Sequence, residues 1–170
     1  MPNPNWAHLP AEHLILVGKI ACQSAYLDLL TGEILGGLKG VKESERAKTI
    51  HVLDTRRKVQ EAEALVKAKF TGQERTDLLD LLKRTGELLA DRNLVLHAIV
   101  GYRKMELVDP VYIAFRGKYV GKDMPFSKET LEPIFDELVS TSKELEAQCG
   151  KRGYTEFVTS PEKPQPPAQV

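Results

Sequence analysis

Apolar residues recur at intervals of three and four along most of the chain, the spacing that places them on one face of a helix. In the first such stretch Leu14, Val17, Ala21 and Ala25 follow this spacing. Glycines then interrupt the pattern and predict a loop over 36–42. The apolar periods predict four long helices, over 11–35, 44–70, 73–101 and 127–148.

Small side chains gather within the first predicted helix. Gly18, Ala21, Cys22 and Ala25 lie on neighbouring turns, and small residues let a second helix approach closely. We therefore expect this helix to be central and largely buried. Cys22, in this apolar stretch, and the distant Cys149 are expected to be buried as small hydrophobic residues rather than to form a disulfide or a metal site.

Strand-forming residues replace the helical pattern between the third and fourth helices. Val111, Tyr112 and Ile113 favour a strand within 105–120, and the basic segment 116–118, with its central glycine, suits a tight turn. A hairpin of this size is marginally stable alone and has to pack against the helices. The stretch therefore predicts a short β-hairpin.

The pattern as a whole predicts a mainly α fold, a four-to-five-helix up-down bundle with a short β-hairpin inserted before the last long helix. Residues 10–150 would form the bundle domain and 1–9 an N-terminal extension. The tail over 151–170 is rich in proline and has almost nothing apolar to bury, so it is expected to be disordered.

Composition and charge fit an ordinary globular protein and limit its partners. Lys and Arg together number 24, and so do Asp and Glu, so the chain has no overall positive field to gather nucleic acid and any such contact has to be local. The start lacks the basic-then-apolar order of a signal peptide, and no apolar run reaches about 20 residues. A cytoplasmic protein without membrane contact is expected.

The chemically informative stretch is Arg92-Asn93-Leu94-Val95-Leu96-His97, late in the third predicted helix. Arg92 falls on the apolar seam of that helix, where leucines are expected, while Asn93 and His97 lie one turn apart beside the seam. Arg92 and His97 diverge by about 140° on an ideal helix. They could meet at one substrate only through the reach of the arginine, a local distortion, or a second subunit.

Two interpretations of Arg92 stay open at this point. A buried guanidinium remains charged and needs a partner. The structural interpretation pairs Arg92 with an acidic residue of another helix, Asp28 being one candidate, and leaves His97 a hydrogen-bonded residue inside the bundle. The functional interpretation makes Arg92, Asn93 and His97 a catalytic group.

The six-residue stretch resembles the R-x4-6-H signature of HEPN domains, in which a polar residue, often asparagine, follows the arginine. The order of long helices, with the motif late in the third of them and an insertion before the last, is also similar. The resemblance implies a metal-independent endoribonuclease without cofactors that acts as a homodimer, with the motif helices facing each other. It implies that His97 acts as general base or acid, that Arg92 holds the scissile phosphate, and that Asn93 orients the phosphate or His97.

The partners of such a protein follow from the same resemblance. RNA would be the substrate, and an antitoxin or a nucleotidyltransferase-like protein would be the partner if the chain is the toxin of a toxin-antitoxin or defence system. Lys104, Arg116 and Lys118 either form a basic rim for RNA phosphate beside Arg92 or are ordinary solvated residues. Other HEPN-like proteins are inactive, so the alternative is a non-catalytic dimeric binding or scaffold module with a structural arginine.

Overall fold

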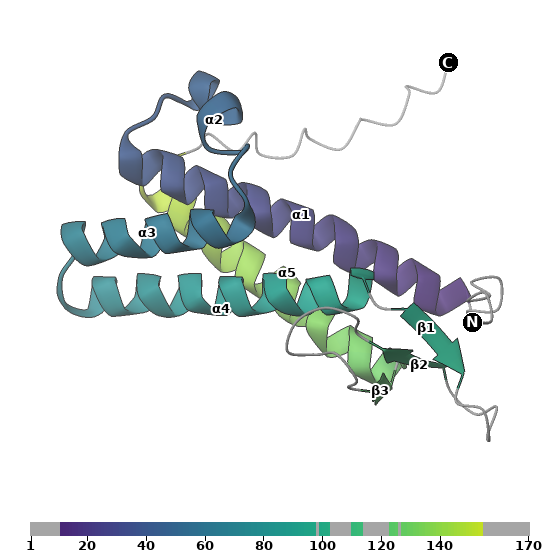
Figure 1. The fold of residues 1–170 in the computed structure, drawn as a ribbon. Coiled ribbons are helices and arrows are strands. Elements are labelled where there is room, and N and C mark those ends of the chain that lie inside the picture. The colour runs from purple at the N-terminus through teal and green to yellow at the C-terminus, as the bar shows by residue number, and fades with distance from the viewer. Residues whose placement is uncertain (1–10, 98, 103–109, 114–122, 126, 155–170) are drawn as a thin grey trace, which may run out of the picture.

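The protein is mainly helical in its computed structural model, which describes residues 11–97, 99–102, 110–113, 123–125 and 127–154 (Figure 1). These residues form helices and three short strands that together make one bundle with a small sheet at its edge. In chain order the elements are α1 (Ala11–Lys39), α2 (Glu43–Thr49), α3 (Thr55–Lys69), α4 (Gly72–His97), β1 (Ile99–Tyr102), β2 (Pro110–Ile113), β3 (Asp123–Pro125) and α5 (Lys128–Lys151).

The first helix is longer than its pattern predicts, because the glycines expected to form a loop lie inside it. A Cβ at Gly36 would lie 2.7 Å from Cδ of Arg46, and one at Gly37 would lie 2.2 Å from Cγ of Tyr154. Glycine is therefore needed there so that other side chains can pack against the helix backbone. The helix ends at Lys39, and Gly40 follows with a φ of 70°, a left-handed conformation that favours glycine.

The predicted helix over 44–70 is two helices. The side chain of Asp54 accepts a hydrogen bond from the backbone N–H of Arg57 at 2.9 Å and caps α3. Ile50, which follows α2, is buried in the core. The chain therefore turns inward after α2 and starts a new helix at Thr55, a break that the continuous apolar pattern conceals.

Helices α1 and α3 run in the same direction. Asp28 of α1 pairs with Lys58 near the start of α3, and the carbonyl of Leu38 near the end of α1 accepts a hydrogen bond from Lys69 at the end of α3. Residue numbers therefore rise together along both helices. The segment containing α2 carries the chain back along α1 before α3 begins (Figure 1).

Helix α5 also runs in the direction of α1. The ammonium of Lys19 lies 5.8 Å from the ring centroid of Phe135, and further along Gln23 donates a hydrogen bond to Ser142 at 2.9 Å. The most extensive packing between elements is that of α1 on α5. The parallel order of the two helices means that the start of α1 lies beside the start of α5.

Helix α4 runs the opposite way. Arg84, in the middle of α4, pairs with Glu144, and Glu74 at its start pairs with Arg152 just after the end of α5. Three long helices thus point one way and α4 the other. The prediction of a helical bundle is confirmed, but its up-down order is wrong, because the α2 segment reverses the chain between α1 and α3.

A three-stranded antiparallel sheet of order β1-β2-β3 connects α4 to α5. Ile99 pairs with Ile113, and Ile113 in turn pairs with Asp123. Strand β1 begins within the stretch predicted as the end of the third helix. Val111, Tyr112 and Ile113 lie in β2 as their β-propensity indicates, whereas the predicted hairpin turn over 116–118 lies outside the described residues.

The end of α5 belongs to the bundle beyond the boundary predicted at residue 150. Arg152 reaches Glu74 at 2.6 Å and lies 5.3 Å from the ring centroid of Phe70. The carbonyl of Tyr154 accepts a hydrogen bond from Arg46. The folded unit therefore extends to Tyr154, and the rest of the predicted tail, 155–170, lies outside the described residues.

Helix α1 is apolar along its length. One 18-residue window has a mean hydropathy of 1.3, so by length and composition the helix could cross a membrane, although the sequence was expected to contain no such run. A mostly buried core helix of a soluble protein and a signal sequence near the N-terminus both pass the same test, and 28% of this window is buried. The second half of α1 does lie in the core, through Leu27, Leu30, Ile34, Leu35 and Leu38.

Candidate functional site

The run of buried positions along the seam of α4 ends at Arg92. Leu78, Leu82, Thr85 and Leu89, the seam positions before it, are buried, as the helical spacing predicts. Arg92 itself is only partly buried. Arg92 is therefore less buried than the seam position predicts, because the seam of an α-helix drifts by about 20° per heptad and buried contact passes to other positions of the last turns.

The side chain of Arg92 forms no ion pair with any residue that the structure describes. Its Nε atom is shielded from solvent and has no hydrogen-bond partner there. Asp28, the candidate partner, is already occupied: it accepts hydrogen bonds from Lys58 Nζ and from Thr55 Oγ1, each at 2.6 Å. The salt bridge predicted by the structural interpretation is not formed with Asp28.

Asn93 is exposed beside a shallow groove between α3 and α4. The floor of the groove is apolar around Gly86, where an added Cβ would only touch Val59 at 3.5 Å. Its edges carry both signs of charge, so the groove attracts neither cations nor anions as a whole. The lining residues are Thr55, Arg56, Val59, Gln60, Glu63, Lys83, Gly86, Glu87, Leu89, Ala90 and Asn93.

His97 is the last residue of α4. Its backbone lies about 6 Å along the helix axis from Asn93, one helical turn further on. The chain leaves the helix there and enters β1 at Ile99. The predicted motif therefore stands at the exit of α4, while the predicted rim residues Lys104, Arg116 and Lys118 lie outside the described residues.

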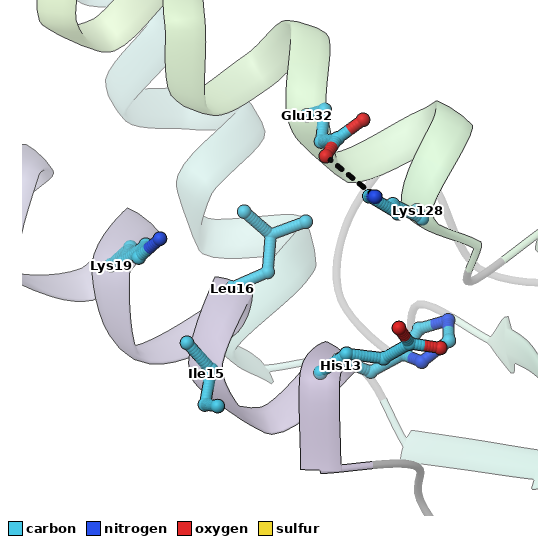
Figure 2. Close-up of a pocket in the computed structure, with 7 residues that line it drawn as sticks. His13, Ile15, Leu16, Lys19, Lys128 and Glu132 are labelled. Carbon is cyan, nitrogen blue, oxygen red and sulfur yellow. Dashed lines mark ion pairs between the residues drawn. The ribbon is translucent and has the colours of Figure 1, made fainter.

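A second concave site, which the sequence did not indicate, lies where α1 and α5 begin (Figure 2). His13 and Lys19 come from α1, and Lys128 and Glu132 of α5 form an ion pair at 3.4 Å across its edge. Linear spacing could not reveal this site, because its residues come from two helices, α1 and α5, that are far apart in the sequence. The full lining is Glu12, His13, Ile15, Leu16, Lys19, Lys128 and Glu132.

The first turn of α5 beside this pocket favours negative charge. Backbone N–H donation, followed by the hydroxyl of Ser127, lowers the pKa of the Glu129 carboxyl from its ordinary value. Free N–H groups at a helix start act in this way because they stabilise an anion. The pocket thus combines basic side chains with an anion-favouring helix start, in a setting that also contains Glu12 and Glu132.

Among the residues described, no three His, Cys, Asp or Glu side chains are grouped so that they could hold a metal ion.

In comparisons with known proteins, no protein-family model, no curated protein and no solved structure matches the chain. The functional argument therefore depends on the residues at the end of α4.

Proposed function

We propose that the protein is a HEPN-like, metal-independent endoribonuclease that acts as a homodimer in the cytoplasm. The observation that carries this proposal is the state of Arg92: a partly buried guanidinium at the exit of α4, in no ion pair with a described residue, beside the exposed Asn93. A cation held at a helix end and left available is suited to bind a phosphate. His97 follows one turn after Asn93.

In the proposed reaction the 2′-hydroxyl of one ribose attacks the adjacent phosphorus, and the bond from phosphorus to the 5′-oxygen of the next nucleotide breaks. His97 accepts the 2′-hydroxyl proton or donates a proton to the leaving oxygen. Arg92 stabilises the negative charge that develops on the phosphate oxygens, and Asn93 orients the phosphate. The products are a 2′,3′-cyclic phosphate and a free 5′-hydroxyl, and RNA is required because DNA lacks the attacking hydroxyl.

Because the net charge of the chain is neutral, the proposed RNA contact is local and does not involve a long basic surface. Lys104, Arg116 and Lys118 remain the proposed phosphate-binding rim. In a toxin-antitoxin or defence system, the partner would be an antitoxin or a nucleotidyltransferase-like protein that covers the end of α4. Such a partner would suppress cleavage by blocking access to Arg92.

The test is incubation of the purified protein with mixed RNAs in EDTA, followed by analysis of the fragment ends. We expect fragments ending in 2′,3′-cyclic phosphate from the wild type and none from Arg92→Ala or His97→Ala. Arg75→Ala is the matched control, because Arg75 is an exposed arginine at the other end of the same helix. A 2′-deoxy nucleotide at a mapped cleavage position should block cleavage at that position alone.

Each of three outcomes would count against the proposal, two concerning the wild type and the motif variants and one concerning the control. One is intact RNA after incubation with a folded wild-type protein, which would favour the non-catalytic binding or scaffold module. The other is equal cleavage by wild type, Arg92→Ala and His97→Ala, which would indicate a contaminating nuclease. Cleavage that Arg75→Ala removes as completely as Arg92→Ala would likewise show that the effect is not specific to the motif.

A further inference from the structure

The groove between α3 and α4 meets the proposed cleavage site at Asn93. Asn93 lines the groove and directly follows Arg92 in the sequence. The two helices pack side by side (Figure 1). The groove therefore extends from the end of α4, where the motif stands, back between the two helices.

Gly86 and Ala90 keep the floor of this groove open. They are four residues apart and so lie on the same face of α4. An added Cβ at Gly86 would meet Cγ1 of Val59 at 3.5 Å and its Cγ2 at 4.0 Å, which is ordinary contact. The packing of α3 on α4 therefore does not require glycine, although glycine is unfavourable inside a helix. What Gly86 provides is open space above Val59.

The groove has the size and the lining of a site for a small ring. Its volume is about 520 Å³, and sites for small molecules typically have about 300–1,000 Å³. Val59, Leu89 and Ala90 make the lining apolar, while Gln60 and Asn93 supply carboxamides that can donate and accept hydrogen bonds. Such a lining suits a flat ring whose edge carries hydrogen-bonding groups.

The charges of the groove favour an uncharged ligand. Arg56 and Lys83 are balanced by Glu63 and Glu87, so the groove as a whole does not attract phosphate. The negative charge of RNA lies on its phosphates, whereas its bases are neutral. The groove is therefore suited to a base of an RNA strand whose phosphate is held outside the groove.

We propose that this groove binds one unpaired base of the RNA substrate, that of a nucleotide next to the cleaved phosphate. This inference rests on the proposed nuclease function, because the motif fixes where the phosphate lies. The base turns out of the strand and lies on the floor at Gly86, where Gln60 and Asn93 contact its edge. Glu63 and Glu87 can accept hydrogen bonds from its amino group. The substrate is then single-stranded RNA with a preferred base at one position beside the cut.

Filling the floor of the groove separates base recognition from chemistry. Gly86→Leu places a side chain on the floor. Gly150→Leu is the matched control, because Gly150 lies in α5 and an added Cβ there meets no atom within 4 Å. On mixed single-stranded RNA in EDTA, the base preference should be the same in the wild type and the control and should disappear in Gly86→Leu. At the preferred site we expect kcat/KM of Gly86→Leu to fall about tenfold, mainly through KM.

Changing the substrate tests the same contact from the other side. An abasic nucleotide at the preferred position should slow cleavage by the wild type as much as Gly86→Leu does. It should slow Gly86→Leu no further, because both changes remove one contact. Pairing that nucleotide with a complementary strand should protect the site, since a paired base cannot enter the groove.

Binding without cleavage keeps this inference distinct from the nuclease function. The probe is a fluorescein-labelled, mixed-sequence single-stranded RNA with 2′-O-methyl riboses, which lacks the attacking hydroxyl. By fluorescence anisotropy we expect Gly86→Leu to bind it about tenfold more weakly than the wild type, and Gly150→Leu to bind it equally well. Gln60→Ala should also bind more weakly, and because Gln60 is exposed this change leaves the core intact. Circular dichroism verifies that each variant is folded.

The two proposals then fail in different ways. If Gly86→Leu and Gln60→Ala bind and cleave RNA as the wild type does, the base site is overturned and the nuclease function stands. If no variant cleaves RNA but binding of the probe still depends on Gly86 and Gln60, the nuclease function is rejected and the base site stands. Equal binding of the probe and of its duplex with a complementary strand would also overturn the base site.

Discussion

Arg92 differs from the other partly or fully buried arginines of the bundle in its surroundings. Arg46 contacts the carboxylate of Glu33, and Arg152 contacts that of Glu74, whereas Arg92 pairs with no described residue. Helical spacing could place Arg92 beside the core, because side-chain direction follows from residue number on a helix. It could not show that Asp28 is engaged elsewhere, since that depends on how α1 and α3 are aligned.

The stability of Arg92→Ala follows from this difference. No described carboxylate loses a partner in this variant, so we expect its thermal midpoint to stay close to that of the wild type. A buried pair would behave otherwise, since removing one member typically costs about 3–5 kcal/mol. Thermal unfolding followed by circular dichroism is the measurement, and a large drop in midpoint would return Arg92 to a structural role.

The buried carboxylate of Glu33, in contrast to the side chain of Arg92, has close charged partners. It accepts a hydrogen bond from Arg46 and lies 2.8 Å from Nε2 of His51, and Arg46 also donates to the carbonyl of Tyr154. We expect Arg46→Ala to destabilise the fold by about 3–5 kcal/mol, because it leaves the Glu33 charge buried with its principal partner gone. Urea denaturation measures the loss.

Arg84→Ala is the control for this prediction. Arg84 pairs with Glu144, but both side chains remain substantially exposed to solvent, and exposed pairs contribute about 0.2–1 kcal/mol. The prediction fails if the two variants lose stability equally. It also fails if the double change Arg46→Ala with Glu33→Gln is no more stable than Arg46→Ala alone, since the second change removes the uncompensated charge.

At the scale of elements, the end of α1 is joined to α3 by a group of charges centred on Glu61. Glu61 accepts hydrogen bonds from Lys39 of α1 and from Arg57 of α3. The hydrogen bond from Lys39, and then that from Arg57, lowers the pKa of the Glu61 carboxyl from its ordinary value near 4.5. The folded state therefore favours the ionised carboxylate.

The lowered pKa of Glu61 determines the direction in which stability changes with pH. With a folded-state pKa below the unfolded one, Glu61 stabilises the fold above about pH 4.5, and this contribution disappears as the pH falls through the lowered pKa. Glu61→Gln should be less stable than the wild type at neutral pH, by no more than about 1 kcal/mol because the group is near solvent. In urea titrations the difference in unfolding free energy between Glu61→Gln and the wild type should disappear at acid pH. A difference that grew on acidification would contradict a lowered pKa of Glu61 in the folded state.

Some elements could be predicted from local sequence patterns, and others could not. Long apolar periods identified α1, α4 and α5, and β-branched and aromatic residues identified β2. The break between α2 and α3 was missed because Asp54 is a single capping residue within a pattern that continues on both sides. The glycines of α1 were mistaken for a loop because their reason for being glycine, close packing of Arg46 and Tyr154, is tertiary.

At the scale of the whole molecule, the reversal of the chain through α2 decides which residues can meet. It aligns α1 with α3 and places the starts of α1 and α5 beside each other, which creates the pocket of His13, Lys19 and Lys128. Sequence patterns fix the faces of helices but leave their relative directions open. Among the residues that the structure describes, Cys22 on α1 is exposed, so its predicted burial is wrong, whereas Cys149 is buried as predicted.

The contacts of Arg152 and Tyr154, the last part of the chain that the structure describes, hold the other end of the bundle together. Tyr154 packs against the backbone of α1 at Gly37, and burial raises the pKa of its phenol above the ordinary value. Arg152 contacts α4 through Glu74 and lies over Phe70. Residues 151–154 therefore tie the end of α5 to the ends of α1 and α3 and to the start of α4.

Two shortened chains test this closing role. A chain ending at Gly150 loses Arg152 and Tyr154, which would leave Glu74 without its partner and expose Gly37 and Phe70. We expect its thermal midpoint to fall clearly. A chain ending at Tyr154 keeps all of these contacts and loses only the proline-rich stretch, so its midpoint should match that of the full-length protein. If the two chains melt alike, the contacts of Arg152 and Tyr154 contribute little and the folded unit ends with α5.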